Sequence, residues 1–269
     1  MQSAKKFKPA AKFAAATSTA CLLAAATQLQ AQGDAVSTSL SLDLNTHFIS
    51  YGAQVWDAEN DWDQLLFNPS IGVDFDLGGG WGIYTGAWAD INSEGSGGGT
   101  GVEELDLWVG TYYSWDIFTI DTNLQAWMYG GDTEGIWDIS FSLSTEESLG
   151  LELSPTILVH NRIKSGPAGD TGTVLDFGLE YGTSYEDLSI SIPLNLGYFV
   201  TDEFHGAGGD DGIGYASIGL MLSYPLPISE SYGSWDIHGG VKYFSTEEDV
   251  TLDTEDSFFT GTIGIGASW

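Results

Sequence analysis

The chain has 269 residues, with 38 acidic against 7 basic side chains and a formal net charge of −31. A chain this acidic has no basic patch that could neutralise phosphates, which excludes nucleic-acid binding. Its one cysteine, Cys21, excludes a scaffold held together by disulfides.

Residues 1–31 have the layout of a Sec-type signal peptide. A lysine-rich start precedes an apolar stretch at 13–26, and Ala31 fits the position before a cleavage site. Cys21 raises a lipoprotein as an alternative, but Ser18 stands where a lipoprotein signal has leucine. Cleavage near Ala31 would leave one domain at 32–269, in which no stretch approaches the roughly 18 apolar residues of a transmembrane helix.

From residue 36 onward the apolar pattern has a period of two, which is typical of β-strands. We predict twelve strands, each at least about nine residues long, the length that a tilted strand needs to cross a bilayer. The predicted strands are 36–49, 65–77, 81–91, 104–115, 117–129, 136–144, 149–162, 173–183, 187–200, 214–224, 234–244 and 258–269.

The connectors between these strands alternate in length. Most of those after odd-numbered strands are long, "GGDTEG" after the fifth is of middling length, and those after even-numbered strands are mostly tight. Bacterial outer-membrane barrels have this asymmetry between their two ends. We therefore predict an all-β fold, an antiparallel transmembrane β-barrel of about 12 strands with short periplasmic turns and long acidic extracellular loops.

The two faces of the strands agree with this interpretation. In 187–200 an unbroken hydrocarbon face, which includes Ile190, Ile192 and Leu194, opposes a face of small and polar residues. Alternation also occurs in soluble sandwiches, so strand length and loop asymmetry carry the argument. Aromatic residues gather near both ends of the strands, as in the two interfacial girdles of membrane barrels.

The opposite face supplies a candidate pore lining. Its acidic members outnumber its basic ones, and fixed negative charge favours the passage of cations. The charged candidates are Asp74, Asp106, Asp121, Asp138, Glu152, Asp176, Glu180 and Asp236, with Arg162 and Lys242. The aromatic candidates are Tyr84, Trp88, Trp108, Tyr112 and Trp127. These rings either form a wall for a solute such as a sugar or nucleoside or fill a narrow barrel, and the sequence leaves both open.

No motif indicates catalysis or a cofactor. The glycine-rich run at 95–101 lacks the lysine of a phosphate-binding loop, and the four histidines are too scattered for a metal-binding pair. We therefore predict no enzyme, no catalytic residue and no metal site. The acidic loops could hold divalent cations loosely, although a solvated acidic surface explains them more simply.

The last predicted strand ends on an aromatic residue. Phe259, Ile263, Ile265 and Trp269 share its outward face, so we predict a membrane anchor whose tryptophan lies at the periplasmic interface. The segment also resembles the C-terminal signal that the barrel-assembly machinery recognises in outer-membrane proteins. Outer-membrane lipid and this machinery are the partners that the sequence predicts, besides small solutes.

Three segments of the region 40–115 carry a family resemblance: "LDLNTHFISYG" at 42–52, "NPSIGVDFDLGGGWGIYTGAWADI" at 68–91 and "ELDLWVGTYYSW" at 104–115. With these segments the chain resembles the TorF-type putative porins. In that family an early strand with Tyr and "RGIS" comes first, and here "FISYG" stands in its place. The resemblance implies a barrel in the outer membrane of a Gram-negative cell and a porin role, with no defined substrate.

These observations predict a porin-like channel for passive diffusion of small solutes, with a leaning toward cations. A non-conducting barrel that is structural, or that binds a partner through its acidic loops, is the alternative. A soluble, secreted β-sandwich or lectin is a further alternative.

Overall fold

The computed structural model describes residues 35–56, 65–92, 101–145, 152–167, 169–253 and 255–269. The predicted signal peptide lies outside the described residues, as do the loop acids Asp57, Glu59, Asp61 and Asp63. No helix in the described part of the chain is long and apolar enough to cross a membrane.

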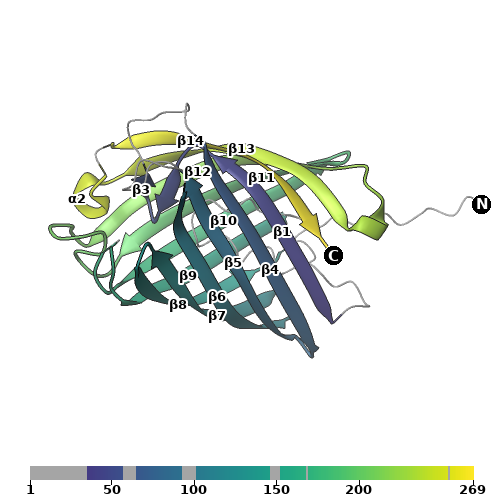
Figure 1. Ribbon diagram of the computed structural model, residues 1–269, viewed down its shortest axis with the longest axis horizontal. Coiled ribbons are helices and arrows are strands. Elements are labelled where there is room, and N and C mark those ends of the chain that lie inside the picture. Colours follow the sequence, from purple (N-terminus) through teal and green to yellow (C-terminus); the bar gives the residue numbers. More distant parts are fainter. Residues whose placement is uncertain (1–34, 57–64, 93–100, 146–151, 168, 254) are drawn as a thin grey trace, which may run out of the picture.

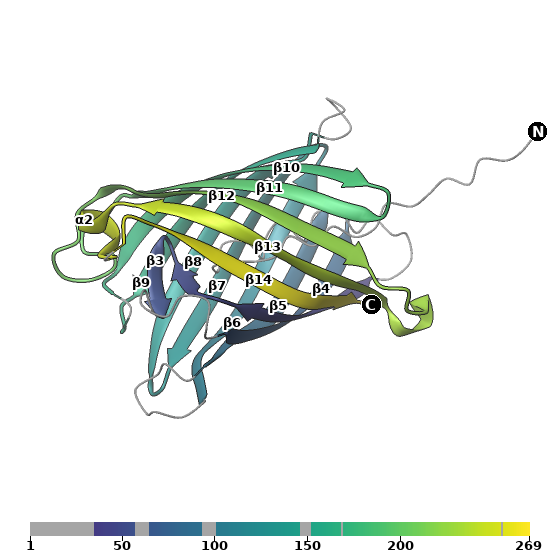
Figure 2. The same cartoon turned by 90° about the horizontal axis from the view of Figure 1, so that it is seen from above.

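Twelve strands form a closed antiparallel barrel, which confirms the predicted fold (Figures 1 and 2). They are β1 (Val36–Asn45), β4 (Leu66–Gly78), β5 (Trp81–Asn92), β6 (Gly101–Trp115), β7 (Phe118–Tyr129), β8 (Asp132–Leu143), β9 (Glu152–Lys164), β10 (Gly172–Tyr185), β11 (Leu188–Phe199), β12 (Gly212–Pro225), β13 (Ser234–Thr246) and β14 (Ser257–Ser268). Each strand pairs with its neighbours in the chain, and β1 closes the ring by pairing with both β4 and β14. Closure satisfies the backbone of every barrel strand on both edges, which a lipid environment requires.

The barrel has two different ends. At one, which we call the short-turn end, lie the turns after β4, β6 and β10 and the C-terminus (right in Figure 1). At the other, the long-loop end, lie the loops after β1, β11 and β13, including the short helix α2 (Glu248–Thr251). The connection from β12 to β13, predicted as fairly tight, is a longer turn that contains the 3-10 helix η3 (Glu230–Tyr232).

The prediction for the connection after β7 is wrong. Instead of a loop at 130–135, Gly130 and Gly131 make a two-residue turn, and β8 begins at Asp132. Both glycines have positive φ, 46° and 133°, which tight hairpin turns use and which glycine adopts without strain. The connections at the long-loop end are therefore not all long.

The first predicted strand, 36–49, is also wrong at its end. β1 stops at Asn45, and the chain then forms a separate two-stranded hairpin from β2 (Phe48–Ser50) and β3 (Ala53–Trp56). Tyr51 and Gly52 are its turn, with φ of 47° and 84°. Every residue from Thr46 to Gly52 is buried, so the alternation of a barrel wall ends here because both faces of the segment are covered.

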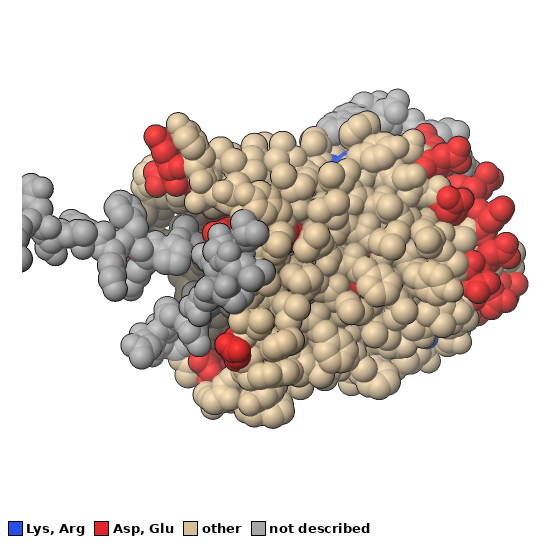
Figure 3. All heavy atoms as spheres, turned by 180° about the vertical axis from the view of Figure 1, so that it is seen from behind, with Lys and Arg blue, Asp and Glu red and all other residues tan. Residues whose placement is uncertain are grey.

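The outside of the barrel is apolar. Its outward side chains remain exposed, as with Leu124 at 54% and Ile263 at 53%. Figure 3 shows Asp and Glu crowded at the long-loop end and a broad belt with few charges between the two ends. At the short-turn end, the rings of Trp81, Tyr113 and Trp115 pack in a row with centroids 4.6 and 5.5 Å apart. Such a belt with aromatic borders fits a bilayer rather than water, which argues against the soluble sandwich.

The inside of the barrel contains the aromatic core. It lies toward the long-loop end, where the β2–β3 hairpin and the loop 200–211 meet side chains from the barrel wall. Its members are Ile49, Tyr51, Trp127, Ile136, Leu158, Val174, Phe199, Phe204, Tyr215, Phe244, Val250 and Phe258.

Candidate functional site

The structure places the predicted charged and aromatic lining on the inner face of the wall. Strand register brings several members side by side: Asp106 lies opposite both Trp88 and Trp127, and Tyr112 lies opposite Asp121. The inner face also includes Asp74, Tyr84, Trp108, Asp138, Glu152, Arg162, Asp176, Glu180, Asp236 and Lys242.

Burial of most of these side chains is graded along the barrel axis, and the exceptions are Asp121 and Asp236, which are buried although they lie toward the short-turn end. Toward the long-loop end Trp127, Asp138 and Arg162 are sealed, with at most 1% of their surface exposed. Toward the short-turn end Asp74, Glu152 and Glu180 are only partly buried, as are the serines of β1 and β11. The interior is thus filled at one end and open toward the other, and the predicted set does not line a uniform passage.

The β2–β3 hairpin provides much of this filling. The Tyr51 hydroxyl lies 2.7 Å from His160 Nδ1, and the two rings are 4.2 Å apart. At the base of the hairpin Phe48 packs on Trp88 with ring centroids 5.2 Å apart. A Cβ added to Gly52 would meet the Tyr215 ring at 2.6 Å, so the turn lies directly against the inner face of β12. The hairpin is therefore docked inside the barrel on contacts from several strands.

A hydrogen-bond network on the inner face of the wall surrounds the Tyr51 hydroxyl. His160 Nδ1 also lies 2.7 Å from Asp138 Oδ1, while Gln125 donates to the other oxygen of Asp138 at 2.7 Å. Trp127 donates from its indole to Gln125 at 2.9 Å and stacks on the His160 ring. Because buried polar groups are costly unless paired, this network fixes the position of His160 and hence of the hairpin.

Arg162 attaches a second loop to the same wall. Its Nε lies 2.9 Å from Glu134 Oε2, and both side chains are fully buried. Its Nη1 donates to the carbonyl oxygens of Phe204 at 2.5 Å and Asp170 at 3.2 Å, and the guanidinium lies 4.1 Å from the centre of the Phe204 ring. One cation therefore holds the loop 200–211 across the mouth of the barrel.

His205 in this loop joins the two closures. Its Nε2 donates to the carbonyl oxygen of Tyr51 at 3.3 Å, and its ring packs on Phe199 and Phe204. Burial, with a smaller contribution from Arg162, lowers the pKa of His205 to about 3. His205 is thus neutral at physiological pH, and a neutral ring can be buried among these aromatic side chains.

Carboxylates are concentrated on the wall formed by β5 to β8. Asp90, Glu104, Asp106 and Glu134 are each at most 2% exposed, and Asn68 and Asn92 donate to Asp90 at 2.8 and 2.6 Å. Within the described residues no group of histidine, cysteine and acidic side chains has the arrangement of a metal site.

Two rings of the predicted aromatic wall pack against glycines of the neighbouring strand. A Cβ at Gly82 would meet the Tyr112 ring at 2.1 Å, and one at Gly110 would meet the Tyr84 ring at 2.3 Å. The Tyr84 hydroxyl donates to Asp121 at 2.8 Å, and Tyr112 donates to Asp74 at 3.2 Å. These rings are fixed parts of the wall between the filled and the open part of the interior.

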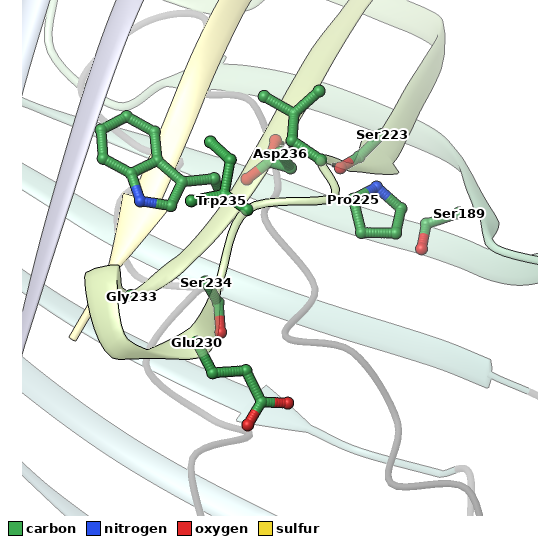
Figure 4. A pocket seen from close by; sticks show the side chains of 10 residues that line it. Ser189, Ser223, Pro225, Glu230, Gly233, Ser234, Trp235 and Asp236 are labelled. Atoms are coloured by element: carbon green, nitrogen blue, oxygen red, sulfur yellow. Dashed lines mark hydrogen bonds between the residues drawn. The ribbon is translucent and has the colours of Figure 1, made fainter.

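A cavity of about 240 Å³ lies at the short-turn end beneath the turn from β12 to β13 (Figure 4). Ser189, Ser223 and Asp236 line it from the strands, while Glu230 extends from the turn. Trp235 and Trp269 border this turn, and both indoles donate to the carbonyl oxygen of Tyr232, at 2.7 and 2.9 Å. Trp269 thereby ties the last strand to the neighbouring turn.

Sequence reasoning missed the residues that close the barrel. Tyr51, Phe204 and His205 lie in segments predicted as loops, and the sequence predicts no role for His160. The run "THFISYG" carried a usable signal, because four of its residues are large or apolar without alternating.

No family model and no curated protein matches the chain. Solved structures similar to it include the KdgM porin, at 12% identity and a TM-score of 0.48 over 86% of this chain and 99% of that one. The NanC porin has 11% identity and a TM-score of 0.48 over 85% and 98%. The translocator domain of the autotransporter NalP from Neisseria meningitidis has 11% identity and a TM-score of 0.46 over 91% and 92%.

Proposed function

We propose that this chain is an outer-membrane channel of the porin type, through which small solutes diffuse passively. The observation that carries the proposal is the closed barrel with an apolar belt outside and charged, partly open walls inside. Such a shell gives polar solutes a route through a layer that otherwise excludes them. The long-loop end would face the exterior and the short-turn end the periplasm, as in other barrels of this class.

The channel would favour cations. Asp74, Glu152 and Glu180 lie in the more open half of the interior, while the basic side chains Arg162 and Lys242 are almost completely buried. Arg162 is moreover neutralised by Glu134. The charged side chains that a passing ion meets in this half are therefore acidic.

The docked hairpin would restrict the channel to small solutes. Phe48 to Tyr51 occupy the interior where the barrel is already filled by Trp88, Trp127 and Tyr215. A TorF-type relationship, assembly by the barrel-assembly machinery through β14 and loose binding of divalent cations to the loop acids belong to the same proposal.

Conductance in planar lipid bilayers tests it. The purified protein should give small discrete current steps, and a KCl gradient should give a reversal potential on the cation side. Glu180→Gln should reduce that potential, while Asp116→Asn, in an exposed turn after β6, is the matched control and should not. The absence of current at every voltage would remove the channel function, and a reversal potential on the anion side would remove the cation preference.

The second candidate is a non-conducting barrel with a role at the cell surface. It is favoured by the interlocked closure of the long-loop end, where Asp210 N donates to Asp249 O at 2.6 Å and Gln54 N to Asp253 Oδ2 at 2.8 Å. In that case the acids displayed on the closure would form the functional surface. The same bilayer recording separates the two functions, because only the channel carries current.

A further inference from the structure

His238 on β13 lies between two carboxylates. Its Nε2 is 2.8 Å from Asp43 Oδ1 on β1, and its Nδ1 is 2.8 Å from Asp236 Oδ1 two residues away on its own strand. As whole residues, all three are at most 8% exposed. Neither contact belongs to the closure of the long-loop end.

The two hydrogen-bond partners of His238 indicate the charge of its ring. Each of the two carboxylate oxygens also accepts a serine hydroxyl, Asp43 from Ser41 at 2.8 Å and Asp236 from Ser223 at 3.2 Å. Because a carboxylic acid is ordinarily a stronger acid than an imidazolium, the hydrogen in each of the two short contacts belongs on the ring nitrogen. Both ring nitrogens of His238 must therefore carry hydrogen, which makes the ring an imidazolium.

These contacts pass over the closing strand. His238 and Asp43 are both register partners of Gly264 on β14, and Asp236 is a partner of Gly266. A Cβ at Gly264 would lie 2.0 Å from Asp43 Oδ1 and 2.6 Å from His238 Nε2, so only glycine leaves room for the contact. The ion pair thus joins β13 directly to β1 across the strand that completes the ring.

We infer that His238 is a fixed imidazolium that fastens this closure of the barrel and cancels the charge of Asp43 and Asp236 at the inner face. The titratable groups that face it are these two aspartates, while β14 presents glycines and β12 presents Ser223. In the proposed channel, on which this part of the inference rests, His238 is a specificity-determining residue. By neutralising Asp236, it lowers the negative charge of the inner face that attracts cations.

Three variants test the inference: His238→Gln, Asp43→Asn with Asp236→Asn, and the triple variant that combines them. His238→Gln leaves two buried carboxylates without their cation, so the equilibrium constant for urea-induced unfolding in lipid vesicles should rise on the order of 100-fold. The triple variant removes the carboxylate charges as well and should recover most of that loss. If His238→Gln does not fold at all while the triple variant does, the inference also holds; equal stability of parent and His238→Gln overturns it.

Two further measurements report the charge itself. The ¹⁵N shifts of both His238 ring nitrogens at neutral pH should have imidazolium values, and a neutral tautomer would overturn the inference whether or not the barrel conducts. In planar bilayers His238→Gln should move the reversal potential further to the cation side, and the triple variant should move it back. If no variant carries current, the proposed channel fails, while the unfolding and ¹⁵N results still decide the role of His238.

Discussion

Arg162 illustrates how a buried cation is stabilised in this protein. Its guanidinium has a carboxylate partner in Glu134, two carbonyl oxygens and the face of an aromatic ring. Each contact offsets part of the cost of removing the charge from water. The same side chain on the outer face would meet hydrocarbon alone, without any of these partners.

Ile192 offers that comparison. It points outward near the middle of β11, in register with Tyr181 on β10, so Ile192→Arg should destabilise the barrel by about 2–4 kcal/mol in lipid vesicles. Ser191→Arg is the matched control, because Ser191 faces inward beside Glu180 and donates to it at 3.2 Å. If both variants unfold at the urea concentration of the parent protein, the assignment of the two faces is wrong.

His205 supplies a pH dependence. Its pKa is about 3 in the folded protein against 6.5 when unfolded, so only the unfolded chain takes up a proton between these values. The contribution of His205 is therefore complete above pH 6.5 and is lost as the pH falls toward 3. The loss of stability on acidification, measured by urea unfolding, should be smaller in His205→Gln than in the parent. Identical pH profiles would show that His205 is accessible to water in the folded state.

At the scale of elements, the β2–β3 hairpin departs from the pattern of the other strands. The sequence predicted the barrel strands because one face meets lipid and the other a polar interior, which imposes a period of two. That logic fails at 46–52, where all residues are buried inside the barrel. Period alone could not reveal the hairpin, because its docking depends on His160 and Tyr215, which are far away in the sequence.

The hairpin gives a prediction about conductance. Tyr51→Ala removes both the hydroxyl contact with His160 and the ring packing, so single-channel conductance should increase about severalfold if the undocked hairpin clears the passage. Tyr51→Phe keeps the ring contacts and should give a smaller increase. Unchanged conductance in Tyr51→Ala would show that ions do not pass the docked hairpin at all.

At the scale of the whole molecule, the closure of the barrel could be predicted from the sequence, whereas the side chains that fill its interior could not. Twelve strands with unequal ends indicated a membrane barrel, and the pairing of β1 with β14 follows because an open edge in lipid would leave backbone groups without partners. The inner-face residues followed from alternation. Their partners, such as Asp43 for His238, depend on register between strands at opposite ends of the chain, and the sequence does not display register.

The acids displayed around the long-loop end have a consequence for how ions approach the molecule. They face solution, so their field extends over one screening length, about 10 Å at 0.1 M salt and about 3 Å at 1 M. In dilute salt this field overlaps the mouth and enriches cations there before any of them enters the barrel. In concentrated salt the enrichment disappears and only the charges inside the barrel act. The loops and the interior can thus be told apart by ionic strength alone.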